Sequence, residues 1–248
     1  MSISALIIAK NEEKNLTDCI RCLNFVDQIV VIVDDSKDNT KNIALKFTRF
    51  VFEGSWLKEH DRRNFGISKC KNKWIIEIDA DERVSKNLAL EIMDKINNED
   101  ADFYYIPLLN YVCRKPIKYG WMACLAPDGK YNLFKKKNKK WLEGRVHPAY
   151  QIEGAKGSKF YNCLNHFMSN DISDLINRFN RNTSLYAMDL IEGKKNLNKF
   201  LSKRKIISRF LKCFLIRKGF MNPGIGFLIS FLSAIYPFTA AIKTKSLN

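Results

Sequence analysis

The last 56 residues of the sequence contain no aspartate or glutamate. From Gly193 to the C-terminus the chain carries twelve Lys and Arg residues. The formal charge of the whole 248-residue chain is +16, so most of the excess lies in this segment and the preceding part is nearly balanced. A local excess of positive charge predicts an anionic partner: a nucleic acid, a membrane surface or a phosphorylated substrate.

The sequence also lacks an N-terminal signal peptide, an internal repeat and any low-complexity run beyond the basic stretch 135–140. Together with seven scattered cysteines, an odd number, this predicts a reducing cytoplasmic compartment. Cys19 and Cys22 form a single C-x-x-C. No second Cys or His pair stands at zinc-ligand spacing, and both residues fall on a helical apolar pattern, so we interpret them as packing residues.

Short apolar runs alternate with helical patterns over the first hundred residues. Almost continuously apolar runs are typical of parallel strands buried on both faces. This alternation predicts an α/β fold, with a mostly parallel, Rossmann-like sheet covered by helices on both faces. The apolar runs lie at 3–8, 28–33, 50–52 and 74–78.

The pattern changes after residue 102. Residues 103–112 form an aromatic-rich run that predicts a strand, and the glycines and prolines of 115–165 predict hairpins and loops. Helical spacing returns over 172–190. We therefore predict a catalytic domain and a C-terminal helical, basic region, with bounds 1–170 (halves 1–102 and 103–170) and 171–248.

Polar residues follow the first, second and fourth apolar runs, where a parallel sheet binds its ligands. In "WIIEIDADERV", Asp79 and Asp81 stand at the end of a buried strand, and Asp34 and Asp35 end the second strand. Two carboxylates in D-x-D spacing suit Mg²⁺ or Mn²⁺ bridged to phosphate oxygens. A carboxylate after the second strand suits a base N–H or ribose hydroxyls. Alone, D-x-D is a weak signal, because acidic pairs after strands are often solvated loop residues.

The stretches "SALIIAKNEEKNLTDCIRCLNFVDQIVVIVDDSKDNT" and "WIIEIDADERV" closely resemble the family 2 inverting glycosyltransferases of GT-A fold. The match extends through "YNLFKKKNKKWLEGRVHP", "LNHF" and "RKGFMNPGIGFLISFLSAIYPFTAAIK", and is best to the bacterial branch with lipopolysaccharide-core β-1,4-glucosyltransferases. The resemblance implies a UDP-sugar donor, a lipid-linked glycan acceptor and a divalent cation, Mn²⁺ or Mg²⁺. It implies that Asp79 contacts ribose, Asp81 holds the metal, and the nucleotide is lined by Ala9, Asn11, Glu12 and Asp34.

Two further residues precede the D-x-D strand. Arg63 and Asn64 are predicted to contact the diphosphate or to fix the loop below it.

The loop "VDDSKDNT" departs from the family's "VDxGSTDxT": it lacks the glycine and is one residue shorter. The resemblance therefore leaves open whether Asp34 or Asp35 faces the base.

An inverting transfer needs a base within hydrogen-bond reach of the acceptor hydroxyl. "VHP" stands where many relatives carry His-Glu, so Pro148 replaces an obvious candidate. We predict Glu143 as the base and Asp128 as the next candidate, although a turn cap or surface ion pair explains Glu143 about as well. His166 and, less so, His147 are candidate metal ligands.

Three interpretations compete for the C-terminal segment (nucleic-acid binding, a membrane span and an in-plane anchor), and a purely soluble core helix is a further alternative. "LSKRKIISRFLKCFLIRKG" has the spacing of a basic amphipathic helix, and residues 219–242 carry no charge. The uncharged run is long enough to span a membrane, and no nucleic-acid-binding motif is present. An in-plane anchor on anionic lipid fits best and predicts a cytoplasmic enzyme, peripheral on the inner face of the bacterial inner membrane. A span is disfavoured because four residues would interrupt it: Pro223, Gly224, Gly226 and Pro237.

We therefore predict a metal-dependent inverting glycosyltransferase that moves a hexose, glucose from UDP-glucose, to a lipid-linked glycan such as the lipopolysaccharide core. Another cell-surface polysaccharide is an alternative acceptor. A phosphatase with Asp79 as nucleophile would need a hydroxyl or valine where Arg83 stands, and a nucleotidyltransferase would need a glycine-rich loop after the first strand. A non-catalytic, basic membrane-binding protein on a degenerate transferase scaffold is the alternative from another class.

Overall fold

The computed structural model describes residues 1–98, 100–145 and 148–247. The chain forms two compact units, and both are discontinuous in sequence. The first comprises Met1–Leu108 and Gly129–His166, and the second comprises Leu109–Asp128 and Phe167–Asn248. The division at residue 170 that the sequence predicts stays a prediction, because compactness does not test which segments fold independently.

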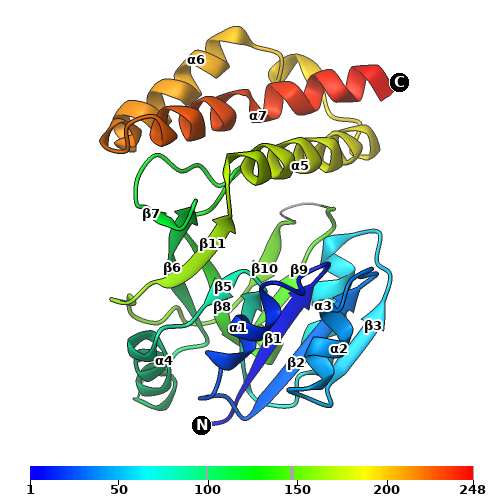
Figure 1. Cartoon of the computed structure of the whole chain (residues 1–248), viewed down its shortest axis with the longest axis vertical. Coiled ribbons are helices and arrows are strands. Elements are labelled where there is room, and N and C mark those ends of the chain that lie inside the picture. The colour runs from blue at the N-terminus through cyan, green and yellow to red at the C-terminus, as the bar shows by residue number, and fades with distance from the viewer. Residues whose placement is uncertain (99, 146–147, 248) are drawn as a thin grey trace. The chain divides into compact units, whose positions relative to one another are not determined.

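The first unit is built on a mixed sheet in the strand order β3-β2-β1-β4-β8-β6-β11-β5 (Figure 1). The first four strands of this order are parallel, and β8 runs antiparallel to both β4 and β6. The bounds are β1 Ile3–Ala9, β2 Gln28–Asp34, β3 Val51–Gly54, β4 Trp74–Asp79, β5 Glu82–Arg83, β6 Phe103–Val112, β8 Gly129–Lys135 and β11 Leu164–Ser169. A separate two-stranded sheet pairs β9 (Lys139–Trp141) with β10 (Tyr150–Ile152).

Helices cover both faces of the parallel strands. On one face the core contains Ile7 of β1, Leu16 of α1 (Leu16–Arg21) and Ile92 of α4 (Lys86–Asn98). On the other it contains Leu6 of β1 and Ile67 of α3 (Glu59–Lys69). Neighbouring β1 residues thus enter different cores, as expected for a strand buried on both faces. The helix between β2 and β3 is α2 (Thr40–Leu45). The prediction of an α/β fold is confirmed.

The cysteines behave as the sequence predicts. Cys19 of α1 is fully buried in the core, and Cys22, the C-cap of the same helix, packs against that core. Burial raises the pKa of both thiols, which disfavours the reactive thiolate.

The second unit is mainly helical, and α7 packs against both α5 and α6 (Figure 1). Its core contains Trp121, Phe179 and Tyr236, and β7 (Lys115–Ile117) pairs with the end of β6. The π-helical turn η3 continues α6 directly. The bounds are α5 Ile172–Glu192, η2 Leu197–Lys199, α6 Lys203–Leu211, η3 Lys212–Ile216, η4 Gly219–Met221 and α7 Ile225–Leu247.

The expected interruption of the uncharged segment is wrong for Gly226 and Pro237, because α7 runs continuously through both. Proline has no N–H, so Pro237 cannot donate to the carbonyl of Ser233 one turn earlier. That carbonyl accepts from the Arg209 guanidinium of α6 instead, at 3.2 Å from Nη2 and 3.3 Å from Nε. A neighbouring helix therefore replaces the hydrogen bond that the proline removes.

One helix within the described residues, Ile225–Ser246, is long and apolar enough to cross a membrane by length and composition. Half of its most apolar window is buried within the protein. Residues such as Ile229, Ser230 and Ala240 are fully buried, and α7 packs against α5 and α6. Burial of this kind is also found in the core helices of soluble proteins, so the apolar sequence alone does not define a span.

The replacement of the missing Pro237 hydrogen bond by the bond from Arg209 to the Ser233 carbonyl can be tested with a double-mutant cycle. Arg209→Met should lower the free energy of unfolding by about 1–3 kcal/mol, because it leaves the buried Ser233 carbonyl with only the weak thiol donor of Cys124, at 3.7 Å. In a Pro237→Ala background the helix N–H of residue 237 can satisfy Ser233, so the same change should cost less. Urea denaturation measures both losses, with Arg204→Met on the exposed side of α6 as the control. Equal losses in the two backgrounds would contradict this account.

Candidate active site

A partly buried carboxylate, Asp79, and a fully buried one, Glu82, meet two cations at the carboxyl end of β4. Asp79 accepts from Arg63 Nη2 of α3 at 3.1 Å and from Lys130 Nζ of β8 at 2.5 Å. Lys130 also donates to Glu82 Oε1 at 2.6 Å. Glu82 is fully buried, and its other oxygen accepts from the Asp79 backbone N–H at 2.9 Å. Asp79 and Glu82 therefore share one lysine.

The electrostatics follow from this arrangement. Burial alone would raise the pKa of Asp79, but the attraction of Lys130 and Arg63 outweighs it and holds that pKa well below its usual value. Burial raises the pKa of Glu82, with only partial compensation from Lys130. The pKa of Lys130 is raised, because Asp79 and Glu82 outweigh its own desolvation. Lys130 is consequently a permanent cation in this site.

Asp81, the second carboxylate of the D-x-D, lies next to His166. Its Oδ2 is 3.7 Å from His166 Nε2, and both side chains are largely buried. The two residues come together because β11 pairs with β5, which places His166 opposite Glu82. Within residues 1–98, 100–145 and 148–247, no group of three or more His, Cys, Asp or Glu side chains could hold a metal by itself.

The two aspartates after β2 differ in position. Asp34 is almost completely buried and accepts from Arg62 Nη1 at 2.5 Å and from the Trp56 backbone N–H at 3.1 Å. Asp35 has a left-handed backbone (φ 44°), and its exposed carboxylate bonds to Lys37 at 2.6 Å. That lysine lowers the pKa of Asp35. Asp34 therefore points into the protein and Asp35 lies on the surface.

The loops after β1 and β2 are tied together by reciprocal hydrogen bonds. Asn11, at φ 55°, accepts from the Lys37 backbone N–H at 2.7 Å and donates its own N–H to Ser36 Oγ at 3.0 Å. The Glu12 N–H donates to Thr40 Oγ1 at 2.8 Å. Ala9, at the end of β1, is buried. These contacts hold the two predicted nucleotide loops in one fixed relation.

Asn64 uses its whole amide group on one residue. Its Nδ2 donates to the Trp141 carbonyl at 2.9 Å, and its Oδ1 accepts from the Trp141 N–H at 3.0 Å. The Arg63 guanidinium stacks over the Trp141 ring at 4.8 Å. Asn64 therefore holds the last residue of β9, next to the loop that follows it. A contact with the diphosphate stays a prediction.

A second buried ion pair supports the same loop. Lys139 bonds to Glu77 of β4, and Trp141 Nε1 donates to the other oxygen of Glu77 at 2.7 Å. Burial lowers the pKa of Lys139 to about 8, although the attraction of Glu77 opposes this shift. Lys139 therefore pairs with Glu77.

The predicted bases lie in exposed positions. The Glu143 carboxylate is 73% exposed and bonds to Lys58, and Gly144 beside it accepts from the Glu59 N–H at 3.1 Å. Asp128 belongs to the second unit, is 71% exposed and lies 3.7 Å from Arg217. His147 lies outside the described residues, and Pro148 is buried.

Sequence reasoning missed four residues of this region: Arg62, Lys130, Glu77 and Lys139. Glu77 had a signal, because a charged residue inside an apolar strand needs a buried partner. Lys139 lay inside the basic run 135–140 and looked solvated. No local pattern distinguished Lys130 or Arg62 from other basic residues.

The mixed sheet and the D-x-D at the end of β4 define a glycosyltransferase of the GT-A type. The chain belongs to glycosyl transferase family 2, whose family model matches residues 4–150. An uncharacterized glycosyltransferase of Rickettsia prowazekii is 30% identical and covers 99% of this chain and 87% of its own. The lipopolysaccharide core biosynthesis glycosyltransferase LpsC of Rhizobium meliloti is 27% identical over 98% of this chain and 92% of its own.

Among solved structures, S. aureus TarS residues 1–349 in complex with UDP-GlcNAc has a similar fold. The TM-score is 0.51 at 12% identity, with 100% of this chain and 91% of that chain covered. At this identity the likeness concerns the fold alone. The predictions of the family, the GT-A fold and a glycosyltransferase activity are confirmed.

Lys130 can be tested by the pH dependence of stability. Lys130→Met should lower the free energy of unfolding by about 3–5 kcal/mol at pH 7.5, because the buried Glu82 and the partly buried Asp79 lose the cation that they share. Without Lys130 their folded-state pKa values rise, and a raised carboxyl pKa stabilises the fold as the pH falls through it. The loss should therefore be smaller at pH 5.

Chemical denaturation at both pH values measures this difference. Lys41→Met is the matched control, since its pair with Glu53 is exposed and contributes at most about 1 kcal/mol. A loss for Lys130→Met that is the same at pH 5 and pH 7.5 would show that Asp79 and Glu82 do not depend on this cation.

Proposed function

We propose that this enzyme is a metal-dependent, inverting glycosyltransferase that transfers glucose from UDP-glucose to a lipid-linked glycan such as the lipopolysaccharide core. The observation that carries the proposal is the Asp81–His166 pair, 3.7 Å apart beside Asp79 at the end of β4. The likeness to LpsC over nearly the whole chain supports the acceptor class. A cytoplasmic position, peripheral on the inner face of the inner membrane, follows from such an acceptor.

The residues present fit a divalent cation. A carboxylate oxygen and an imidazole nitrogen that share one ion each lie about 2.0–2.2 Å from it, so a separation of up to about 4 Å is compatible. Mg²⁺ commonly takes one or two protein groups and completes its shell with water and substrate phosphate. Asp81 and His166 would hold Mn²⁺ or Mg²⁺, which when bound supplies positive charge for the leaving diphosphate.

The nucleotide is proposed to lie along the loops after β1 and β2. Asp34 is the better candidate to face the base, because it is buried and fixed by Arg62, whereas Asp35 is occupied by Lys37 on the surface. Asp79 would accept a ribose hydroxyl with the lone pairs that Arg63 and Lys130 leave. Ala9, Asn11 and Glu12 would line the nucleotide from the β1 side.

In the transfer itself, the acceptor oxygen forms a bond to the anomeric carbon as the bond from that carbon to UDP breaks. UDP leaves with the electron pair, and the configuration inverts. Glu143 is proposed to take the acceptor's proton, and Asp128 is the alternative. Glu143 is linked to the D-x-D through its loop, since Gly144 bonds to Glu59, Glu59 to Arg63, and Arg63 to Asp79.

Calorimetric titration of UDP and GDP, with and without Mn²⁺, tests the donor class and the metal site together. We expect UDP to bind more tightly than GDP, and Mn²⁺ to strengthen UDP binding on the order of tenfold or more. Asp81→Asn should remove that strengthening, because a neutral amide is a poorer ligand for a hard cation. Asp94→Asn, on the surface of α4, should bind as the wild type does. Full Mn²⁺ dependence in Asp81→Asn would exclude the proposed metal role.

Asn64→Ala separates a positioning role from a donor contact. If Asn64 acts through Trp141, the change should lower kcat on the order of tenfold or more, because the loop with Glu143 is misplaced, and leave UDP affinity within about twofold. Asn42→Ala, on an exposed part of α2, is the control. A parallel loss of UDP affinity and kcat would instead assign Asn64 to the donor.

A further inference from the structure

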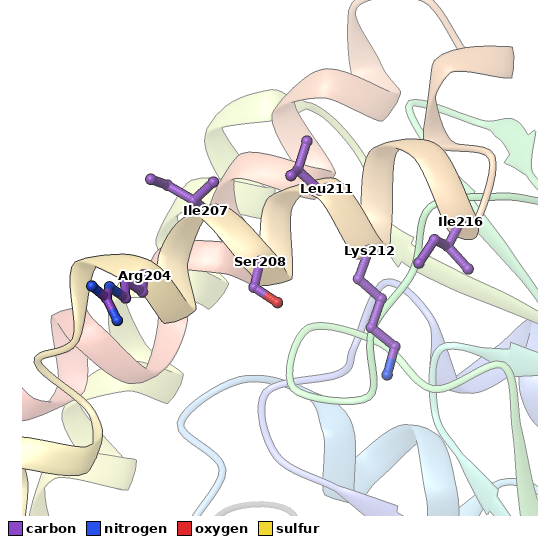
Figure 2. A pocket seen from close by; sticks show the side chains of 6 residues that line it. All are labelled: Arg204, Ile207, Ser208, Leu211, Lys212 and Ile216. Atoms are coloured by element: carbon purple, nitrogen blue, oxygen red, sulfur yellow. The ribbon is translucent and has the colours of Figure 1, made fainter.

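The outward side of α6 and η3 carries large apolar residues among basic ones, whereas an ordinary surface helix is polar on its outward side. The exposed fractions are 61% for Ile207, 45% for Leu211, 53% for Leu215 and 76% for Ile216. An open hollow runs along this side (Figure 2). We call it the α6 outer face and define it by the residues that line the hollow: Arg204, Ile207, Ser208, Leu211, Lys212 and Ile216.

The opposite side of the same helix is fixed within the second unit. Arg209 donates to the Ser233 carbonyl and to Cys124 Sγ. Cys213 is fully buried, and the Phe210 and Phe214 rings pack against Phe227 of α7 at 5.4 and 6.0 Å. Rotating the helix to hide its apolar side would break these contacts. The outer face is therefore exposed as a consequence of the packing of α6.

Positive charge surrounds this apolar face. Residues 203–218 contain seven Lys and Arg and no acidic residue. Of these, Lys203, Lys205 and Lys218 are exposed beside Arg204 and Lys212 of the face itself. A second copy docked through this face would bring two strongly positive surfaces together, which opposes self-association. A nucleic acid would neutralise the charge but would leave Ile207 and Ile216 in water.

We infer that the α6 outer face docks in the plane of an anionic lipid bilayer. Ile207, Leu211 and Ile216 would enter the boundary between headgroups and acyl chains, and the lysines and arginines would lie at the lipid phosphates. α7 would stay packed within the protein, consistent with its burial against α5 and α6. This binding needs neither donor nor metal, so it stands or falls separately from the proposed transfer.

Flotation of the full-length protein with phosphatidylglycerol–phosphatidylcholine vesicles tests the apolar contribution. The triple variant Ile207→Ser, Leu211→Ser, Ile216→Ser should bind these vesicles on the order of a hundredfold more weakly than the wild type. The matched control replaces exposed apolar residues elsewhere, Leu45→Ser, Leu90→Ser and Met188→Ser, and should bind as the wild type does. The outer-face variant should unfold in urea as cooperatively as the wild type, which shows that it is folded.

The charge contribution is tested with Lys203→Gln, Arg204→Gln and Lys212→Gln combined. Each basic residue near an anionic surface strengthens binding about fivefold, so this variant should bind roughly a hundredfold more weakly at low salt. Its weak binding to pure phosphatidylcholine vesicles should not change. The control replaces three lysines of the first unit: Lys46→Gln, Lys86→Gln and Lys137→Gln.

Insertion is measured directly with Ile216→Trp, whose fluorescence should shift to shorter wavelength when anionic vesicles are added. Leu90→Trp, exposed on α4, should show no shift. Wild-type flotation of the serine variant, or an unshifted Ile216→Trp that floats with the vesicles, would overturn the inference. The inference would also be overturned if the serine variant lost self-association in size-exclusion chromatography but kept its vesicle binding. The α6 outer face would then join two copies of the chain.

Discussion

The carboxyl end of β4 depends on charges that no single segment can supply. Glu82 is fully buried and Asp79 is partly buried, and removing ionised groups from water costs up to several kcal/mol each unless partners offset it. The partners come from α3, as Arg63, and from β8, as Lys130. The parallel strands therefore need the antiparallel strand that follows residue 128 in order to bury their own acidic end. This requirement explains in physical terms why one compact unit contains both Met1–Leu108 and Gly129–His166.

Glu77, two residues before Asp79 in β4, is also paired with groups that other segments supply. Side chains of a strand alternate between faces, so Ile75, Glu77 and Asp79 share the face of β4 that packs toward α3. Glu77 receives Lys139 and the Trp141 indole there, one step from the cations of Asp79. Because Asn64 and Arg63 of α3 hold the same Trp141, strand, helix and loop are fixed by one set of polar contacts. A loop that carries a candidate base is thereby held by the strand that carries the D-x-D.

The sequence was a good guide to the elements and a partial guide to the site. The run 74–78 appears as β4, Trp74–Asp79, and the run 103–112 as β6, because long apolar patterns dominate where strands form. Which of Asp34 and Asp35 turns inward could not be read locally, since it depends on Arg62 and on a left-handed residue at Asp35. Lys130 and Lys139 were missed for the same reason: a basic residue becomes a buried partner only once another strand delivers a carboxylate to it.

Pro237 shows how a correct local rule can give a wrong structural expectation. The proline does remove the hydrogen bond to Ser233, as the rule states. Whether the helix then breaks depends on a donor 28 positions earlier in the chain, and Arg209 supplies it. This hydrogen bond also fixes the orientation of α6, because Arg209 can reach Ser233 only if its side of the helix faces α7. The residues on the other side, Ile207 and Ile216 among them, are then left facing outward, so a proline in one helix helps to set which surface its neighbour exposes.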